Sequence, residues 1–243
     1  MKVTVIGMWG GFPKVDEPCS GYLIEHNEEK VLLDCGSGVA LKLGKYTDVN
    51  TLRHIVVSHS HYDHASDIGV MMFSRLVNTI TKQTDVGLTI YEPYKEISSL
   101  QPEPVQFSEF KSYDEDSVLR IGDMSIRFLE MNHPVKTYAM KISTDDKTVV
   151  YTADGTISEA LKKFSQGADL LITECSLYEW ADGENTGHMN ITDCIELVKD
   201  AGVKETILTH LPHYGEINDL LETARYRGLE NVQLAQPGLT IEV

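Results

Sequence analysis

The chain has few cysteines, no long apolar run and fewer basic than acidic residues. Its four cysteines, Cys19, Cys35, Cys175 and Cys194, form no Cys-x-x-Cys pair, which excludes a disulfide framework and a zinc ribbon. We therefore expect buried, reduced thiols.

No apolar stretch reaches the roughly 18 residues that a membrane-spanning helix needs.

The N-terminal run reaches Gly7 before the apolar core of a signal peptide could form, so we expect a cytoplasmic protein. The 21 basic residues stand against 37 acidic ones, a formal net charge of −16. This charge repels polyanions, which disfavours a long nucleic-acid footprint. It is compatible with a small anionic substrate if divalent metals make the local potential positive.

The composition is that of an ordinary globular protein, with 42% hydrophobic and 24% charged residues among 243. The chain contains no repeat, low-complexity segment or linker. Its length suits one large α/β domain better than two small ones, and we expect a single domain over residues 1–243.

The most informative stretch is Ser58–His64, which directly follows the apolar, β-branched run at 55–57. A strand that leads into a ligand-rich loop is a common way to hold a metal on a rigid scaffold. In a turning loop, the first two histidines can point one way while the last two ligands lie past the turn. That geometry suits two adjacent metals. The candidate ligands are His59, His61, Asp63 and His64.

Three further ligand types stand where apolar strands are expected to end. His133 follows a strand that ends at Met131, Asp154 lies in Ala-Asp-Gly, and His210 lies in Thr-His-Leu. Any one of them alone would be read as a structural histidine or a turn aspartate. Their shared position, together with the first cluster, indicates ligands from elsewhere in the chain.

Two other features near expected strand ends each allow two interpretations. Asp34 precedes Gly36 and is either a turn former or the hydrogen-bonding anchor of a metal-bound histidine. The glycine-rich segment 7–13 either borders a ligand or is a plain turn.

The coarse secondary structure alternates between strands and helices. A capping box is expected at Thr156–Glu159, a helix cap at Asn190, and a solvated turn at Tyr113–Asp116. A proline-punctuated loop is expected at Pro102 and Pro104. The expected strands are 2–6, 20–24, 30–34, 55–57, 88–91, 105–107, 118–121, 125–131, 138–142, 148–151, 168–173, 203–208 and 238–243, and the expected helices 66–82, 156–167, 190–201 and 216–227.

These motifs resemble the metallo-β-lactamase superfamily. The resemblance implies an α/β fold, a four-layer αββα sandwich with a dinuclear site at one sheet edge. It also implies that Asp154 bridges two divalent metals, which we expect to be zinc, with manganese as the alternative. One metal would be held by His59, His61 and His133, and the other by Asp63, His64 and His210.

A second match narrows the branch. Thr173–Ser176 and Gly187–Asn190 are similar to the Glu-Ala-Thr and His-Ser-Thr elements of RNase Z-type zinc phosphodiesterases. The resemblance implies that Glu174 orients His188, which contacts phosphate and protonates the leaving oxygen. Both motifs depart from the pattern in their last two residues. The alternative is that His188 is the exposed end of a loop.

One departure bears on the substrate. RNase Z enzymes carry a long tRNA-gripping arm between the third histidine and the bridging aspartate, whereas here His133 and Asp154 are separated by 154 − 133 = 21 positions. This spacing leaves no room for an arm and argues against tRNA 3′-end processing. The chain most resembles the RNase Z-like bacterial hydrolases of the YhfI type.

We therefore predict a dinuclear metal-dependent hydrolase, a phosphodiesterase that uses a metal-bridging hydroxide on a small phosphodiester or nucleotide. Asp63, Glu174 and His188 are the expected catalytic residues. The alternatives are a thioester or lactone hydrolase on the same site, since one fold hosts several chemistries, and a non-catalytic metal-binding protein. We expect no membrane partner, and the resemblance allows a homodimer.

Overall fold

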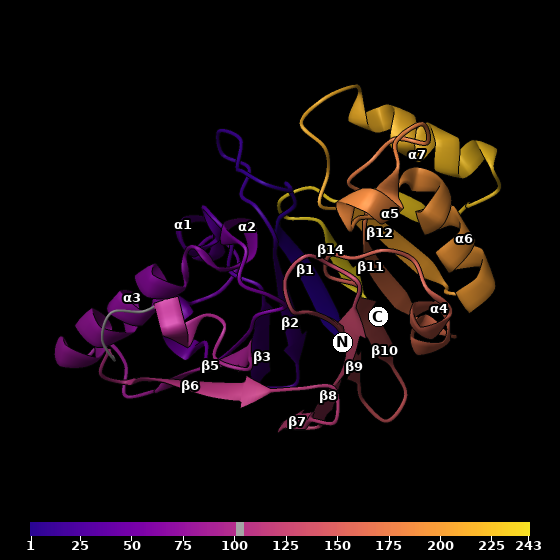
Figure 1. Cartoon of the computed structure of the whole chain (residues 1–243). Coiled ribbons are helices and arrows are strands. Elements are labelled where there is room, and N and C mark those ends of the chain that lie inside the picture. The colour runs from indigo at the N-terminus through magenta and orange to yellow at the C-terminus, as the bar shows by residue number, and fades with distance from the viewer. Residues whose placement is uncertain (101–104) are drawn as a thin grey trace. The chain divides into compact units, whose positions relative to one another are not determined.

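The structure is a computed structural model that describes residues 1–100 and 105–243 (Figure 1). The loop expected at Pro102 and Pro104 lies outside the described residues. The backbone forms two compact units. Unit 1 contains residues 1–114 and 236–242, and unit 2 contains residues 115–235 together with residue 243. The expectation of a single domain over 1–243 stays a prediction.

Unit 1 is built on a seven-stranded sheet in the described part of the chain, with the order β14-β1-β2-β3-β4-β5-β6. Neighbouring strands are antiparallel from β14 to β3 and parallel from β3 to β6. The strands are β1 (Lys2–Gly7), β2 (Gly21–His26), β3 (Glu29–Leu33), β4 (His54–Val56), β5 (Leu88–Pro93), β6 (Ser108–Tyr113) and β14 (Thr240–Glu242).

The helices of unit 1 are short except for one. They are α1 (Val39–Leu43), η1 (Val49–Thr51), α2 (Tyr62–Ala65), α3 (Ile68–Ile80) and η2 (Ser98–Leu100). Helix α3 buries Ile68, Met71 and Met72 in the same core as Leu32 and Ile55 of the sheet. The two methionines therefore fill the core, as their helical spacing indicates.

Unit 2 is built on a second seven-stranded sheet of described residues, with the order β13-β12-β11-β10-β9-β8-β7. Strands β10 to β13 are parallel, because helices connect them, whereas β7 to β10 form antiparallel hairpins. The strands are β7 (Val118–Ile121), β8 (Met124–Met131), β9 (Thr137–Ser143), β10 (Thr148–Tyr151), β11 (Leu170–Glu174), β12 (Glu205–Thr209) and β13 (Val232–Leu234).

The helices of unit 2 are α4 (Glu159–Ser165), α5 (Gly183–Thr186), α6 (Ile191–Ala201) and α7 (Ile217–Tyr226). Helix α6 starts as expected: the Asn190 side chain accepts from the backbone of Asp193, and the Asp193 carboxylate accepts from the Asn190 N–H. It ends at Gly202, whose φ of 61° is the left-handed conformation that glycine favours.

Three local predictions were wrong. Helix α4 is capped by Ser158, whose hydroxyl accepts from the Leu161 N–H at 3.1 Å, so no capping box begins at Thr156. The strand expected at 105–107 lies instead at 108–113, because Phe107 has a φ of 66° that interrupts extended backbone. Tyr113 is the last residue of that strand and not part of a turn.

The composition-based expectations about thiols hold. All four cysteines are buried thiols, and burial raises the pKa of Cys19 to about 12. Within residues 1–100 and 105–243, no helix combines the length and the apolar character required to cross a bilayer.

A buried guanidinium joins α3 to the segments around it. Arg75 is 3% exposed and donates to the carbonyls of Leu52 at 2.6 Å, Asn50 at 2.9 Å, Val49 at 3.0 Å and Val86 at 3.1 Å. These carbonyls belong to η1 and to the loops that enter β4 and β5. Because buried carbonyls need donors, this one side chain holds together the segment that leads to the ligand-rich run.

We expect Arg75→Met to lower the free energy of unfolding by about 3 kcal/mol, because four carbonyls lose a charged donor. Urea unfolding followed by circular dichroism measures this. The matched control is Arg225→Met on α7, whose arginine is exposed and should shift stability by less than about 0.5 kcal/mol. Equal effects of the two variants would contradict the assignment.

Candidate metal centre

The ligand-rich run begins where β4 ends. After Val57, the chain makes a turn in which His61 is the N-terminal cap of α2, with a φ of −61° and a ψ of 147°. Asp63 and His64 lie in this short helix and are buried. The change from extended chain to helix separates His59 and His61 from the last two ligand candidates, as the spacing predicts.

Asp34 is the anchor of this run. Its buried carboxylate accepts from the Ser58 N–H at 2.6 Å, from the Ser58 hydroxyl at 2.8 Å and from His64 Nδ1 at 2.7 Å. Of the two interpretations of Asp34, the structure supports the one in which it orients a histidine. The residue also has a φ of 56°, so it occupies the turn at the end of β3.

These contacts determine where the histidine protons lie. A carboxylate only accepts, so Nδ1 of His64 carries a hydrogen. The single Ser58 hydrogen goes to Asp34, so Ser58 Oγ accepts from His59 Nδ1 at 2.9 Å. Both imidazoles therefore present Nε2 as the atom for a ligand, which is the arrangement found around protein-bound metals.

The distances between these atoms fit a shared cation. His59 Nε2 lies 3.1 Å from His61 Nδ1, close to the separation of about 3.3 Å that two imidazole nitrogens have on one tetrahedral zinc. His64 Nε2 lies 3.5 Å from Asp63 Oδ2. Unit 1 therefore holds three nitrogens and one carboxylate suited to divalent metals.

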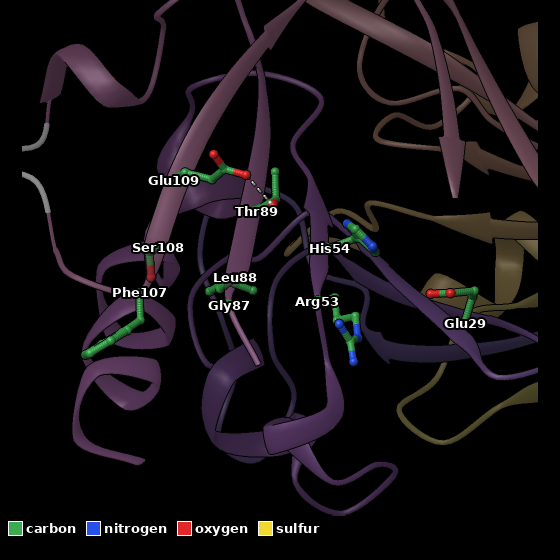
Figure 2. Close-up of a pocket in the computed structure, with 9 residues that line it drawn as sticks. All are labelled: Glu29, Arg53, His54, Gly87, Leu88, Thr89, Phe107, Ser108 and Glu109. Carbon is green, nitrogen blue, oxygen red and sulfur yellow. Dashed lines mark hydrogen bonds between the residues drawn. The ribbon is translucent and has the colours of Figure 1, made fainter. Parts of the chain in front are cut away.

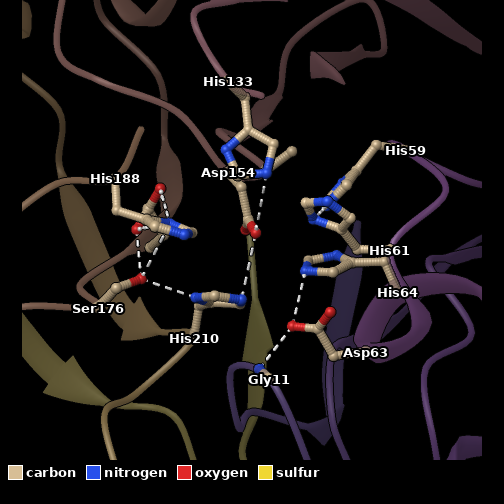
Figure 3. Close-up of polar contacts among 12 residues, drawn as sticks. Gly11, His59, His61, Asp63, His64, His133, Asp154, Ser176, His188 and His210 are labelled. Atoms are coloured by element: carbon tan, nitrogen blue, oxygen red, sulfur yellow. Dashed lines mark hydrogen bonds and ion pairs between the residues drawn. The ribbon is translucent and has the colours of Figure 1, made fainter. Parts of the chain in front are cut away.

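The glycine-rich segment borders this ligand set. The N–H of Gly11 donates to Asp63 Oδ2 at 2.6 Å (Figure 3). Gly11 has a φ of 72°, which glycine adopts without steric cost. The contact orients the Asp63 carboxylate, so this segment is more than a plain turn.

The three later candidates lie on one sheet. His133, Asp154 and His210 follow the ends of β8, β10 and β12 in unit 2. Asp154 Oδ2 is 3.2 Å from His210 Nε2 and 4.0 Å from His133 Nε2 (Figure 3). His133 Nδ1 donates to the Gly187 carbonyl at 2.8 Å, which leaves its Nε2 on the side of Asp154. Burial lowers the pKa of His133, which favours the neutral imidazole that a metal ligand requires.

Glu174 orients histidines in unit 2, as Asp34 does in unit 1. Its buried carboxylate accepts from the Gly155 N–H at 2.7 Å, from His188 Nδ1 at 3.1 Å and from the Ser176 hydroxyl in a short contact. Because the Ser176 hydrogen goes to Glu174, Ser176 Oγ accepts from His210 Nδ1 at 2.7 Å. One carboxylate thus holds one histidine directly and another through a serine.

The hydrogen positions around His210 test whether a metal fits here. With Nδ1–H donated to Ser176, His210 directs the lone pair of Nε2 at Asp154 Oδ2 across 3.2 Å. Two lone pairs at this distance repel each other unless a cation, either a proton or a metal, lies with them. The donor chemistry of unit 2 therefore fits a divalent metal. Ligand atoms of Glu174, His188 and His210 also lie within 4.8 Å of one another.

Ser58 and Ser176 are the functional residues that the sequence analysis missed. Both stand inside the quoted motifs, Ser58 directly before the first histidine and Ser176 two positions after Glu174. The local signal was a serine at a strand end, next to His59 in one case and two positions after Glu174 in the other. Serine is too common in loops for that signal to be noticed without the fold.

Unit 1 also contains a hollow of about 560 Å³, and none of the ligand candidates is among its lining residues. Figure 2 shows these lining residues. The hollow is lined by Arg53 and His54 at the start of β4, whereas His59 follows its end. Thr89 donates to Glu109 across it at 3.1 Å. Among the described residues, no potential metal-binding cluster includes a residue of this hollow.

The family model for the beta-lactamase superfamily domain matches residues 29–211. The chain belongs to the metallo-β-lactamase superfamily. It is 40% identical over 243 residues, all of both chains, to the probable metallo-hydrolase YhfI of Bacillus subtilis. The crystal structure of that protein matches with a TM-score of 0.94 and 38% identity over 99% of this chain and 98% of the other.

A ribonuclease Z of Saccharolobus solfataricus is 24% identical over 272 residues, 93% of this chain and 94% of that protein. These similarities confirm the predicted fold class and the relation to RNase Z. Family membership and the His/Asp ligand sets together indicate a metallo-hydrolase.

We expect Ser176→Ala to weaken metal binding by about 10- to 100-fold, because His210 loses the acceptor that fixes its Nδ1–H. Competition of the protein with a chromophoric zinc chelator measures the affinity. Ser176→Thr keeps the hydroxyl and is the matched control, which should bind within about threefold of the parent. An unchanged affinity in Ser176→Ala would exclude the serine from metal binding.

Proposed function

We propose that the chain is a dinuclear metal-dependent phosphodiesterase that acts on a small phosphodiester or nucleotide. The observation that carries this proposal is the Glu174–His188 pair. The His188 side chain is 22% exposed while the Glu174 side chain is 1% exposed, so a buried carboxylate holds an imidazole that a ligand can reach. By the resemblance to RNase Z-type phosphodiesterases, this pair contacts phosphate and protonates the leaving oxygen, whereas in a thioester or lactone hydrolase it would be incidental.

We propose that the chain binds two metals with the ligand sets that the resemblance implies. One metal would be held by His59, His61 and His133, the other by Asp63, His64 and His210, with Asp154 shared. Zinc suits imidazole and carboxylate ligands best, and manganese is the alternative. When bound, two divalent metals lower the pKa of a water and neutralise the anionic oxygens of a phosphodiester.

The chain's own residues would then move the protons. The Asp63 carboxylate is oriented by the Gly11 N–H at 2.6 Å, and we assign to it the proton of the attacking water. His188 donates Nδ1–H to Glu174 at 3.1 Å, and the carboxylate stabilises a second proton on Nε2. That proton is placed to pass to the departing oxygen.

Two further facts bear on the size of the substrate. Residues 134–153 are taken up by β9, β10 and their short connections, which leaves no arm for gripping tRNA. The formal charge of −16 disfavours a long polyanion. One relative is named a ribonuclease Z. This name supports phosphodiester chemistry for the chain but does not imply the same substrate.

We expect Asp63→Ala to abolish turnover of bis(p-nitrophenyl) phosphate by the zinc- or manganese-loaded protein. The carboxylate is proposed both to bind metal and to accept the proton, so no residue remains to replace it. Release of p-nitrophenol measures the rate. Hydrolysis of an activated thioester and of a lactone is measured in parallel. Hydrolysis of the thioester or lactone alone would contradict the phosphodiesterase and favour an acyl hydrolase.

We expect His188→Ala to lower kcat by about 100-fold with metal content unchanged, because proton transfer is lost while the metal ligands remain. Metal content is read by mass spectrometry of the dialysed protein. His26→Ala, at the end of β2, is the matched control and should keep full activity. A parental rate in His188→Ala would remove this histidine from the mechanism.

A further inference from the structure

Unit 2 carries a cluster of three aromatic side chains that its core does not use. Tyr178, Trp180 and Tyr214 contact one another, with ring centroids 6.4 Å, 5.5 Å and 6.0 Å apart. The rings of Tyr178 and Trp180 are nearly parallel, at 4°. Trp180 is 77% exposed and Tyr214 is 44% exposed. We call these three residues the aromatic platform.

The platform is tied to the metal-binding loops of unit 2 by the chain itself. Tyr178 is two residues after Ser176, so their Cα atoms lie within about 8 Å. Tyr214 is four residues after His210, which places their Cα atoms within about 15 Å. The aromatic platform therefore belongs to the same pair of loops as Glu174, Ser176 and His210.

The platform is also held in place. The Tyr178 hydroxyl donates to the Tyr214 carbonyl at 3.0 Å, which joins the two loops. Gly215 has a φ of 70°, and a Cβ at this position would lie 2.6 Å from the Tyr178 ring. Only glycine allows this approach, so the loop after His210 is shaped around Tyr178.

Exposed aromatic surface of this extent needs a reason, because leaving the Trp180 and Tyr214 rings in water forgoes their burial. Glu179 lies between Tyr178 and Trp180 in the sequence, and its carboxylate pairs with Arg227. The pairing reduces the repulsion between this carboxylate and an anionic ligand. The aromatic platform thus offers flat, apolar faces beside a site proposed to hold phosphate.

We propose that the aromatic platform stacks the base of a nucleotide whose phosphodiester lies at the metals. This inference rests on the proposed function and specifies its substrate class. Stacking on tyrosine and tryptophan needs no positive charge, so it suits a chain with a net charge of −16. Every base has a π-face, so the platform selects nucleotides over phosphodiesters without a base.

Binding can be tested without turnover. Trp180 is exposed, while the only other tryptophan, Trp9, is 2% exposed and donates to Glu17. We expect adenosine 5′-monophosphate to quench the fluorescence of the metal-loaded protein, and ribose 5-phosphate to leave it unchanged. Trp9→Phe should keep the quenching, and Tyr214→Ala should weaken adenosine 5′-monophosphate binding by about tenfold. Quenching by both phosphates alike would overturn the proposal.

Turnover gives the second arm. Trp180→Leu should raise KM for a nucleoside cyclic monophosphate by about tenfold and leave the kinetics on glycerol cyclic phosphate unchanged. Tyr226→Leu, an aromatic residue on α7 that is 92% exposed, is the matched control. Equal losses of catalytic efficiency on both substrates, or no loss on either, would overturn the proposal that the platform stacks a base. Base-dependent quenching in a protein that cleaves no phosphodiester would keep the platform and reject the proposed function.

Discussion

Each unit depends on one buried carboxylate that accepts from a serine hydroxyl and from an imidazole. Asp34 and Glu174 are both fully buried. A buried carboxylate is costly unless its oxygens are hydrogen-bonded, so the donors around each one are required by the folded state. Ser58 and Ser176 each give their single hydrogen to the carboxylate and accept from a histidine. The energetic need of the carboxylate thereby decides which ring nitrogen faces the metal.

The two carboxylates differ in what they connect. Asp34 contacts two proposed metal ligands, His64 directly and His59 through Ser58. Glu174 reaches a proposed ligand through Ser176 and the proposed acid His188 directly. In the proposed mechanism, metal retention and proton transfer therefore share one anchor in unit 2. The same loops carry the aromatic platform, so ligand orientation, acid catalysis and base recognition are proposed to depend on the two loops that follow β11 and β12.

The sequence predicted the fold class, and it predicted that the ligand candidates follow strand ends. Strand ends rich in histidine and aspartate are strong signals because their residue types are unusual there. The sequence did not predict the contacts between segments that are far apart in the chain. Nothing local marks Ser58 or Ser176 as a hydrogen-bond relay, and Phe107 interrupts a strand through a backbone angle that its residue type does not favour. Ser158 displaced the capping box expected at Thr156 because it lies nearer to the first apolar turn of α4.

The most direct test of the fixed-tautomer account is the state of the histidine rings in the metal-free protein. Long-range ¹H–¹⁵N correlation spectra at alkaline pH distinguish rings protonated on Nδ1 from rings protonated on Nε2. The account predicts that His59, His64 and His210 carry the hydrogen on Nδ1 before any metal binds, and that zinc shifts only their Nε2 resonances. Rings that exchange between both forms, or that carry the hydrogen on Nε2, would show that the carboxylates do not prepare the site.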